Sequence, residues 1–331
     1  MARASEDELI ARHLAPLAGA GALGLKDDAA LLTPKAGHDL VLTVDAVVEG
    51  VHFLPGDPPG SVAAKALGVN LSDLAAKGAE PAGFLMVLAL PDDWTEPWLS
   101  AFCEGLGRAS RAGTCPLLGG DTVRAAGPLS ISVTAFGQVP SGTMVRRTAA
   151  QPGDLVAVTG TIGDAVLGLA LLGEKPPAWR DCLSEDETGF LTGRYREPRP
   201  RLAWAGALRE HAHAAMDVSD GLAGDAAKLL GASGLGGGLD LDQIPYSAAA
   251  AKVLEADPGW RDRLVTGGDD YELLFTFPEA AGPALRQRAV ETGLPMTVIG
   301  RVGEKGGAVS FLSAGCEYRF SRTSFQHFGA A

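Results

Sequence analysis

A turn signal near residue 152 divides the sequence into two series of strand-like and helix-like segments. Pro152, Gly153 and Asp154 are residues that favour a tight turn, and the run LVAVTG that follows them predicts a new strand. A chain of 331 residues is long enough to bury two separate cores. We therefore expect two domains, 1–148 and 149–331, of the α+β or α/β class.

Each series mixes the periodicities of strands and helices. Apolar and β-branched runs predict strands at 40–48, 83–90, 129–139, 155–160, 238–245 and 271–277. Apolar residues at helical spacing predict helices at 6–18, 61–78, 94–113, 163–173 and 201–211, and 174–200 is expected to be a loop with a short helix. Glycine-rich turns connect these segments, which is typical of an enzyme of mixed class.

The acidic composition limits the partners that the chain can have. The formal net charge is −12, so we expect no nucleic-acid partner, although divalent cations would let an acidic site hold a nucleotide. The four cysteines form no CxxC pair, and we expect a reducing cytoplasm rather than a disulfide framework or a zinc site. There is no apolar signal core and no run of about 18 uncharged apolar residues, so we expect no membrane association.

The motif GAGALG at residues 19–24 matches the glycine fingerprint of nicotinamide dinucleotide sites, with Asp45 following at the end of a predicted strand. That fingerprint requires a strand before the glycines and a helix after them. Here a helix is predicted before them, and LKDDAALL after them is expected to form a turn and a short strand, so we reject this interpretation. The sequence also lacks a Walker A motif and a protein-kinase catalytic loop, so any nucleotide must bind in another way.

Aspartates recur at predicted strand ends and turns with small neighbours. They comprise Asp27, Asp28, Asp45, Asp121, Asp217, Asp220, Asp269 and Asp270, while Asp73 lies inside a predicted apolar helix, three residues after Asn70. Most have a simpler interpretation, with Asp28 and Asp121 as turn residues and Ser219 with Asp220 as a helix cap. Asp73 is harder to explain in this way, because a carboxylate among leucines and alanines is costly unless it is paired.

A divalent metal accounts for the whole set of aspartates. Mg²⁺ prefers carboxylate oxygens and water, and it is commonly held by a few aspartates together with substrate phosphates. The EF-hand spacing expected for Ca²⁺ is absent from the sequence. We therefore expect several Mg²⁺ ions to carry a polyphosphate such as ATP. We also expect these cations, rather than Lys or Arg partners, to hold Asp217, Asp220 and Asp225 together.

Basic residues near these motifs have two interpretations each. Arg146 and Arg147 precede the domain junction, where they are either phosphate ligands or a solvated pair in a linker. His52 follows a predicted strand and either contacts a phosphate or packs in the core. The residues alone leave both alternatives open.

Taken together, these motifs resemble one family, thiamine-monophosphate kinase. The matching strings are DDAALL, TVDAVVEGVHF, KALGVNLSDLAAKGAEP, LLGGDT, RRTAAQPGDLVAVTGTIGDA, MDVSDGL and GGDDYELLF, which follow the family's order across residues 6–328. The resemblance implies the two-domain fold of the aminoimidazole ribonucleotide synthetase-like superfamily, which binds ATP without a P-loop. It further implies an N-terminal α/β domain that binds ATP and Mg²⁺ and dimerises through its strands, a C-terminal α+β domain, and a cytoplasmic homodimer.

The resemblance also implies roles for individual residues. The Mg²⁺ ligands would be Asp28, Thr43, Asp45, Asp73, Asp121, Asp217 and Asp220, with the Val44 carbonyl as a further ligand. Gly120, Asp121, Arg147 and Ser219 would contact ATP, whereas His52, Asp269 and Phe325 would contact thiamine monophosphate. Asp45, Asp121 and Asp217 would be the catalytic residues. The sequence departs from the family at Lys26, where glycine is usual, at Asp269, where Glu is common, and at Gln326, where an acid is common.

The implied reaction is in-line phosphorylation of thiamine monophosphate to thiamine diphosphate by ATP. The attacking phosphate oxygen is already ionised near neutral pH, so the reaction depends on positioning and charge neutralisation. An ATP-using synthetase of the same superfamily is an alternative, although a selenophosphate synthetase would need a reactive N-terminal Cys, and no cysteine precedes Cys103. A Mg²⁺–nucleotide-binding module without catalytic activity is a second alternative.

Overall fold

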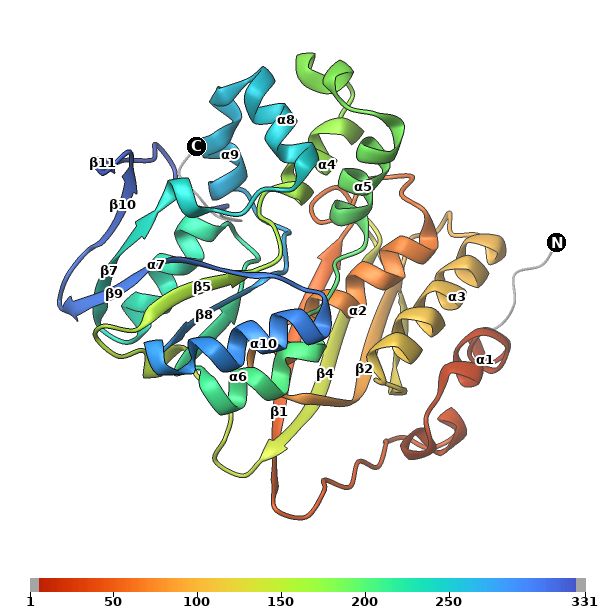
Figure 1. Ribbon diagram of the computed structural model, residues 1–331. Coiled ribbons are helices and arrows are strands. Elements are labelled where there is room, and N and C mark those ends of the chain that lie inside the picture. The colour runs from red at the N-terminus through yellow and green to blue at the C-terminus, as the bar shows by residue number, and fades with distance from the viewer. Residues whose placement is uncertain (1–5, 326–331) are drawn as a thin grey trace. The chain divides into compact units, whose positions relative to one another are not determined.

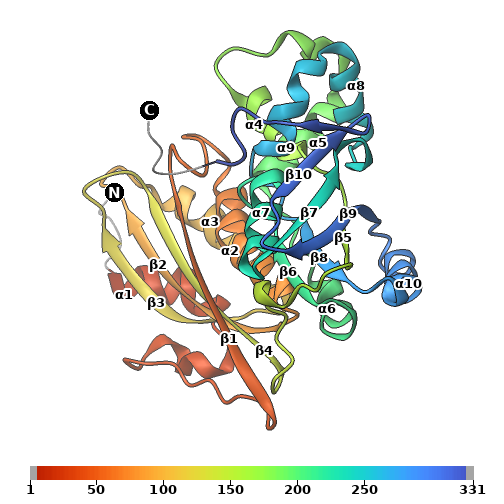
Figure 2. The same cartoon turned by 90° about the vertical axis from the view of Figure 1, so that its left-hand side faces the viewer.

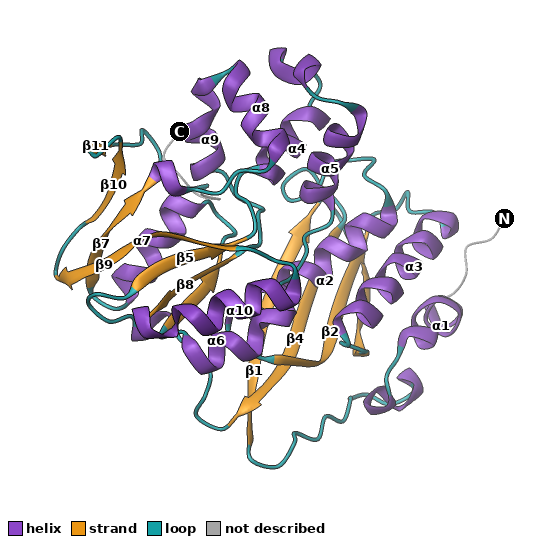
Figure 3. Ribbon diagram, in the orientation of Figure 1, coloured by secondary structure: helices purple, strands orange, loops and turns teal. Residues whose placement is uncertain are grey.

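The computed structural model describes residues 6–325, and its contacts divide the chain into two units. Unit 1 comprises Met1–Leu74 and Ala79–Met144, and unit 2 comprises Ala75–Gly78 and Val145–Ala331. Each unit has its own sheet and its own helices (Figure 1 and Figure 3). Within the described part of the chain, no helix is long and apolar enough to cross a membrane.

Unit 1 is built on a four-stranded mixed sheet with the order β1-β4-β2-β3. The strands are β1 (His38–Val48), β2 (Glu80–Leu90), β3 (Leu117–Arg124) and β4 (Ser130–Pro140). β4 is antiparallel to β1 and to β2, whereas β2 and β3 are parallel. The helices α2 (Pro59–Ala76) and α3 (Glu96–Gly113) cover one face of this sheet, where Phe84, Met86 and Leu88 of β2 are buried (Figure 1).

The other face of this sheet carries exposed apolar side chains. Strand pleating places Leu42 and Val44 on the side opposite to Val41; the first two are 60% and 61% exposed, whereas Val41 is buried. Val87 on β2 and Val123 on β3 are also exposed. We refer to the face that carries Leu42, Val44, Val87 and Val123 as the open face.

The N-terminal segment is helical but irregular, which corrects the prediction of one regular helix over 6–18. α1 (Glu6–Leu9) continues as a π-helix over Ile10–Leu14 and as a 3-10 helix over Ala15–Leu17. Pro16 lacks the amide hydrogen that a regular helix would use, so the hydrogen-bond pattern changes at this point.

The glycine motif at 19–24 lies in a 3-10 segment, Ala20–Leu25, that follows these helical turns rather than a strand. This is not the strand–turn–helix that a dinucleotide fingerprint requires. The short strand predicted after the motif is wrong, because residues 26–35 form no strand. The Leu31 amide instead donates a hydrogen bond to the Gly21 carbonyl oxygen at 2.8 Å.

Unit 2 contains a seven-stranded mixed sheet with the order β11-β10-β7-β9-β5-β8-β6. Its strands are β5 (Leu155–Thr159), β6 (Ala214–Asp217), β7 (Leu235–Asp240), β8 (Leu273–Phe277), β9 (Met296–Lys305), β10 (Val309–Ser313) and β11 (Cys316–Tyr318). Its helices are α4 (Asp164–Leu172), α5 (Glu185–Arg196), α6 (Ala205–His211), α7 (Leu222–Ala232), α8 (Ala248–Ala256), α9 (Arg261–Thr266) and α10 (Gly282–Thr292).

Side chains of the central strands alternate between the two faces of this sheet, and each face packs against its own apolar core. Val156 and Val158 of β5 belong to the cluster that contains Leu229 of α7. Ala157 between them belongs to the cluster that contains Leu285 of α10. Figure 2 accordingly shows α7 on one side of the sheet and α6 and α10 on the other.

Candidate active site

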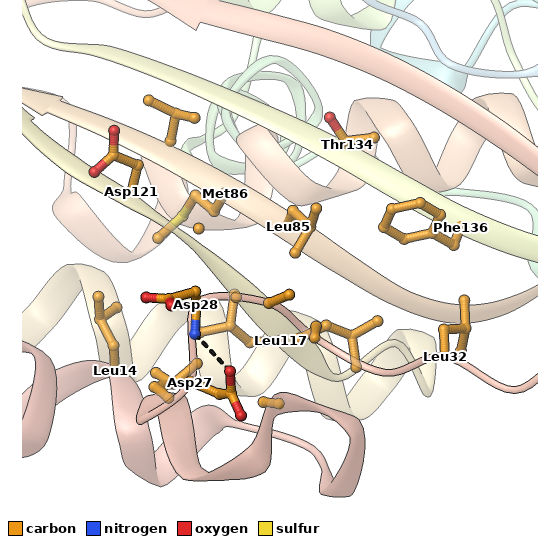
Figure 4. Close-up of a pocket in the computed structure, with 18 of the residues that line it drawn as sticks. Leu14, Asp27, Asp28, Leu32, Leu85, Met86, Leu117, Asp121, Thr134 and Phe136 are labelled. Carbon is orange, nitrogen blue, oxygen red and sulfur yellow. Dashed lines mark hydrogen bonds between the residues drawn. The ribbon is translucent and has the colours of Figure 1, made fainter.

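Unit 1 contains a cavity of about 900 Å³ between the N-terminal segment and the open face. Asp28, Gly120 and Asp121 all line it. Figure 4 places Asp28 and Asp121 toward one end of the cavity and Leu32 and Phe136 toward the other. One end is therefore acidic and the other apolar, which suits a ligand that combines a ring with phosphates bound through cations.

The position of Asp121 depends on the glycine before it. Gly120 lies opposite Met86 in the parallel pairing of β3 with β2. A Cβ atom on Gly120 would lie 1.8 Å from the Met86 carbonyl oxygen, so only glycine lets the strands approach here. Asp121 pairs with Val87, whose side chain lies on the open face, and it therefore reaches the cavity. The interpretation of Asp121 as a turn residue is wrong, because it lies within a strand.

A second group of candidates lies where α2 contacts β1. The Thr43 hydroxyl donates a hydrogen bond to the Asp73 carboxylate. The Asp45 amide donates to the Asn70 side-chain oxygen at 3.0 Å. Asn70 and Asp73 therefore share one face of α2, as their spacing predicts, and Asp73 is half-buried with a hydroxyl partner rather than unpaired.

The unit 1 candidates thus form two groups on opposite faces of one sheet. Thr43 and Asp45 share the face of α2, whereas Val44 between them lies on the open face, as does the cavity lined by Asp28 and Asp121. Within residues 6–325, no group of three or more His, Cys, Asp or Glu side chains has the arrangement of a metal site. The side-chain atoms in both groups that could bind a metal are carboxylate and hydroxyl oxygens, and these ligand atoms fit Mg²⁺.

His52 is half-buried in the turn that follows β1. Its Nδ1 atom accepts a hydrogen bond from the Val48 amide at 3.1 Å, so the neutral ring carries its proton on Nε2. The backbone therefore fixes the orientation of the imidazole and directs its N–H away from Val48. The Nε2–H group of His52 is therefore able to donate a hydrogen bond to a phosphate oxygen.

In unit 2, the loop after β6 brings the remaining candidates together. β6 ends at Asp217, which is 3% exposed. The Asp269 amide donates to the Ser219 carbonyl oxygen, and the Phe325 amide donates to the Asp220 carbonyl oxygen, both at 2.9 Å. The residues expected to contact metal, nucleotide and substrate in this unit therefore lie side by side.

The expectation that cations, and not a lysine, hold the aspartates of this loop together is wrong for Asp220 and Asp225. Lys228 Nζ lies 2.5 Å from Asp220 Oδ2 and 3.0 Å from Asp225 Oδ1. Asp225 is fully buried, and its Oδ2 atom accepts hydrogen bonds from the Ser219 and Asp220 amides. The helix-cap interpretation of Ser219 and Asp220 is also wrong, since α7 begins after Gly221 without a side-chain cap.

The turn that carries Asp269 has a strained backbone. Asp269 and Tyr271 adopt left-handed conformations with φ values of 73° and 50°. Such a conformation costs a residue other than glycine about 1–3 kcal/mol and is found chiefly at functional sites. Gly268 approaches Ser219 so closely that a Cβ atom would lie 2.2 Å from the Ser219 carbonyl oxygen. The Tyr271 hydroxyl donates to Asp269 Oδ1 at 3.3 Å, which orients the carboxylate.

A buried network of charged side chains holds this strained turn. Asp270 accepts hydrogen bonds from the Gly163 amide at 2.8 and 3.0 Å. Arg194 Nη2 donates to the Asp270 carbonyl oxygen at 3.1 Å and to Glu272 Oε1 at 2.9 Å, and Arg201 Nε donates to Glu272 Oε2 at 2.8 Å. Burial raises the pKa of Asp270 well above its usual value, although the Gly163 amide and Arg194 oppose the shift. No role was predicted from the sequence for Arg194, Arg201 or Glu272.

Arg146 and Arg147 are both exposed at the start of unit 2. Arg147 begins a short 3-10 segment, Arg147–Ala149. Its carbonyl oxygen accepts a hydrogen bond from the Ser233 hydroxyl at 3.1 Å, at the end of α7. The backbone that carries Arg147 is thus anchored, while its guanidinium is on the surface.

Comparisons with known proteins identify the family of this chain. Residues 26–139 match the N-terminal domain of AIR synthase related protein, and residues 151–312 match its C-terminal domain. The chain is 39% identical over 305 residues to the thiamine-monophosphate kinase of Salmonella typhimurium, covering 92% of this chain and 91% of that protein. It is 40% identical over 328 residues to that of Caulobacter vibrioides, covering 98% and 91%. The chain belongs to the thiamine-monophosphate kinase family.

Solved structures of thiamine-monophosphate kinases share this fold. That of Stenotrophomonas maltophilia K279a has a TM-score of 0.79 and 40% identity, covering 88% of this chain and 90% of that one. The structure of AaThiL complexed with AMPPCP and TMP has a TM-score of 0.75 and 32% identity, covering 91% of each chain. The expected two-domain fold of mixed helices and sheets is therefore confirmed.

Proposed function

We propose that this chain is a thiamine-monophosphate kinase that transfers the γ-phosphoryl group of ATP to thiamine monophosphate, giving thiamine diphosphate and ADP. The observation that carries the proposal is 39–40% identity to thiamine-monophosphate kinases over at least 92% of the chain. The related structure complexed with AMPPCP and TMP supports a nucleotide and a second phosphorylated ligand as substrates.

The proposed ligands are distributed over the residue groups described above. Gly120, Asp121, Arg147 and Ser219 would contact ATP, and His52, Asp269 and Phe325 would contact thiamine monophosphate. Mg²⁺ would be held by oxygens of Asp28, Thr43, Val44, Asp45, Asp73, Asp121, Asp217 and Asp220. When bound, Mg²⁺ supplies positive charge that neutralises the phosphates and the leaving group. Asp45, Asp121 and Asp217 are the proposed catalytic residues, because each would hold Mg²⁺ that carries this charge.

The chemistry needs little from the side chains apart from positioning. A phosphate oxygen of thiamine monophosphate forms a bond to the γ-phosphorus, and the bond from that phosphorus to the β,γ-bridging oxygen breaks. The attacking oxygen is already an anion near neutral pH, so no strong general base is required. The aspartates would repel a triphosphate by themselves, which is why an acidic site of this kind depends on cations.

Incubation of the protein with ATP, MgCl₂ and thiamine monophosphate, followed by chromatography, tests this function. We expect thiamine diphosphate and ADP in equal amounts, and no ADP when thiamine monophosphate is omitted. ADP formed without thiamine diphosphate would indicate a synthetase of the same superfamily, and nucleotide binding without turnover would indicate a non-catalytic module. Either result would contradict the proposal.

We assign ATP and Mg²⁺ binding and homodimer formation to the N-terminal domain, 1–148, and we take 149–331 as a C-terminal α+β domain. The open face supports the dimer, since Leu42 and Val44 are 60% and 61% exposed and large exposed apolar patches mark association sites. We also place the enzyme in the cytoplasm. Its four cysteines are free, and two of them are exposed, which suits a reducing compartment.

Leu42→Glu is expected to convert the homodimer into a monomer, because it places a charge at one of the most exposed apolar positions of the open face. Light scattering after size exclusion should give twice the chain mass of 34.0 kDa for the wild type and the single chain mass for the variant. Val290→Glu is the matched control, since Val290 is 77% exposed on α10 of unit 2. A Leu42→Glu variant that remains dimeric would contradict the use of this face.

A further inference from the structure

Lys228 bridges two acidic side chains in the loop after β6. Its Nζ atom lies 2.5 Å from Asp220 Oδ2 and 3.0 Å from Asp225 Oδ1. The Lys228 side chain is 44% exposed and that of Asp220 is 37% exposed, whereas Asp225 is fully buried. The ammonium group therefore sits at the border between a buried carboxylate and an exposed one.

The geometry gives the two carboxylates different tasks. Asp225 Oδ2 accepts hydrogen bonds from the Ser219 amide at 3.0 Å and from the Asp220 amide at 2.9 Å, so this carboxylate shapes the loop. The Asp220 carboxylate instead meets Lys228 at the partly exposed edge of the loop. Lys228 shares its single positive charge between the two carboxylates and keeps Asp220 beside the buried Asp225.

We propose that Lys228 is a positioning residue, a resident counter-cation that orders the Asp220 loop in the metal-free protein and is displaced from Asp220 when Mg²⁺ arrives with the nucleotide. This inference rests on the proposed function, in which Asp220 is a Mg²⁺ ligand. A divalent ion on that carboxylate would repel an ammonium group 2.5 Å from the same carboxylate. The long, partly exposed lysine side chain can move away while Asp225 continues to bind the loop amides.

Displacement of this kind couples the Lys228–Asp220 contact to the binding of Mg²⁺. Because the two cations compete for one carboxylate, Lys228 lowers the affinity of the loop for Mg²⁺, and Mg²⁺ weakens the Lys228 contact by the same factor. Removing the ammonium group should therefore destabilise the metal-free protein and tighten Mg²⁺ binding. A lysine that served only to stabilise the fold would destabilise the protein equally with and without Mg²⁺ when removed.

Two variants test the proposal, Lys228→Met, which keeps an unbranched side chain without the ammonium group, and Lys228→Gln, which keeps hydrogen bonding without the charge. Lys252→Met is the matched control, because Lys252 is 50% exposed and pairs with Glu187 at 2.6 Å. Melting temperatures are measured in EDTA and in excess MgCl₂ with the non-hydrolysable nucleotide AMPPCP. The half-saturating Mg²⁺ concentration is taken from a titration of the melting temperature.

For both Lys228 variants we expect a melting temperature about 2–4 °C below the wild type in EDTA, with the difference lost in excess MgCl₂ and AMPPCP. The half-saturating Mg²⁺ concentration should fall about two- to fivefold, as expected for the loss of one competing, partly exposed ion pair. Lys252→Met should have the same half-saturating Mg²⁺ concentration as the wild type. Equal destabilisation in both conditions, an unchanged half-saturation, or failure of both variants to fold even with Mg²⁺ would overturn the proposal.

The kinase assay separates this inference from the proposed function. If the wild type makes thiamine diphosphate while the Lys228 variants keep its Mg²⁺ half-saturation, the role of Lys228 is wrong and the function stands. If the wild type makes no product yet the variants bind Mg²⁺ more tightly, the displacement stands and the function is wrong.

Discussion

The variant Asp121→Asn is expected to lose at least about 100-fold in kcat/KM for the formation of thiamine diphosphate, the scale of loss seen when one electrostatic contact to developing charge is removed. Asp121 lines the unit 1 cavity together with Asp28, and the amide of asparagine keeps the size but not the charge that a cation needs. Asp45→Asn should have a comparable effect, since Asp45 belongs to the group at β1 and α2. Both variants are measured by the chromatographic kinase assay described above, with saturating ATP and Mg²⁺ and varied thiamine monophosphate.

Two controls separate a charge effect from a general loss of structure. Asp181→Asn makes the same change at a carboxylate that is 97% exposed, and it should leave kcat/KM unchanged. Cys103→Ser should also remain active, because burial raises the pKa of this thiol to about 12 and leaves it unreactive. Wild-type activity in Asp121→Asn and Asp45→Asn would show that neither carboxylate takes part in catalysis.

The variant Glu272→Gln is expected to lower the free energy of unfolding by about 3–5 kcal/mol, because removing one partner of a buried ion pair leaves the other charges uncompensated. Glu272 has no exposed surface, and it accepts hydrogen bonds from Arg194 and Arg201. Its network also holds the turn of Asp269, so the KM for thiamine monophosphate should rise in the folded fraction. Urea denaturation and kinase kinetics measure the two effects.

Glu279→Gln is the matched control for that measurement. Glu279 pairs with Arg301 at 3.1 Å, but its side chain is 73% exposed. An exposed ion pair contributes about 0–1 kcal/mol, so this variant should have nearly wild-type stability. Equal losses in Glu272→Gln and Glu279→Gln would mean that the buried network does not support the turn.

Hydrophobic periodicity was sufficient to predict most of the strands and helices of unit 1, whereas β9, β10, β11, α8, α9 and α10 of unit 2 were not predicted. Strand predictions at 40–48, 83–90 and 129–139 correspond to β1, β2 and β4, and the helices at 61–78 and 94–113 correspond to α2 and α3. β3 was missed because two adjacent glycines lower its strand propensity, and only the pairing with β2 makes it a strand.

Other differences have equally local causes. The length of helix α5 was underestimated, because the segment 174–200 is rich in charge and was predicted as a loop with a short helix. Ser184 and Glu187 nevertheless form a capping box at the start of this helix. The strand predicted at 271–277 begins at Leu273, since the left-handed backbone of Tyr271 cannot continue it. Sequence patterns do not reveal such backbone strain.

The acidic motifs drew attention to the residues of the site but not to the way in which they group. Strand pleating, which the sequence implies only once β1 and β3 are known to share a sheet, separates Asp45 from Asp121. Lys228 was overlooked although it follows Asp225 by three residues on α7, a spacing that the sequence shows. Arg194 could not be assigned from its motif, because its partners Asp270 and Glu272 lie far along the chain and only the fold brings them near. Charge pairing across a fold is therefore the aspect that sequence spacing predicts least.

Gly120 constrains how mutational data on this family should be understood. Its backbone lies so close to Met86 that any larger residue would push the paired strands apart before it could disturb a ligand. Loss of activity at position 120 is thus no measure of ligand contact, and substitutions meant to alter what the cavity accepts have more room at Phe136 and Leu32, at its apolar end.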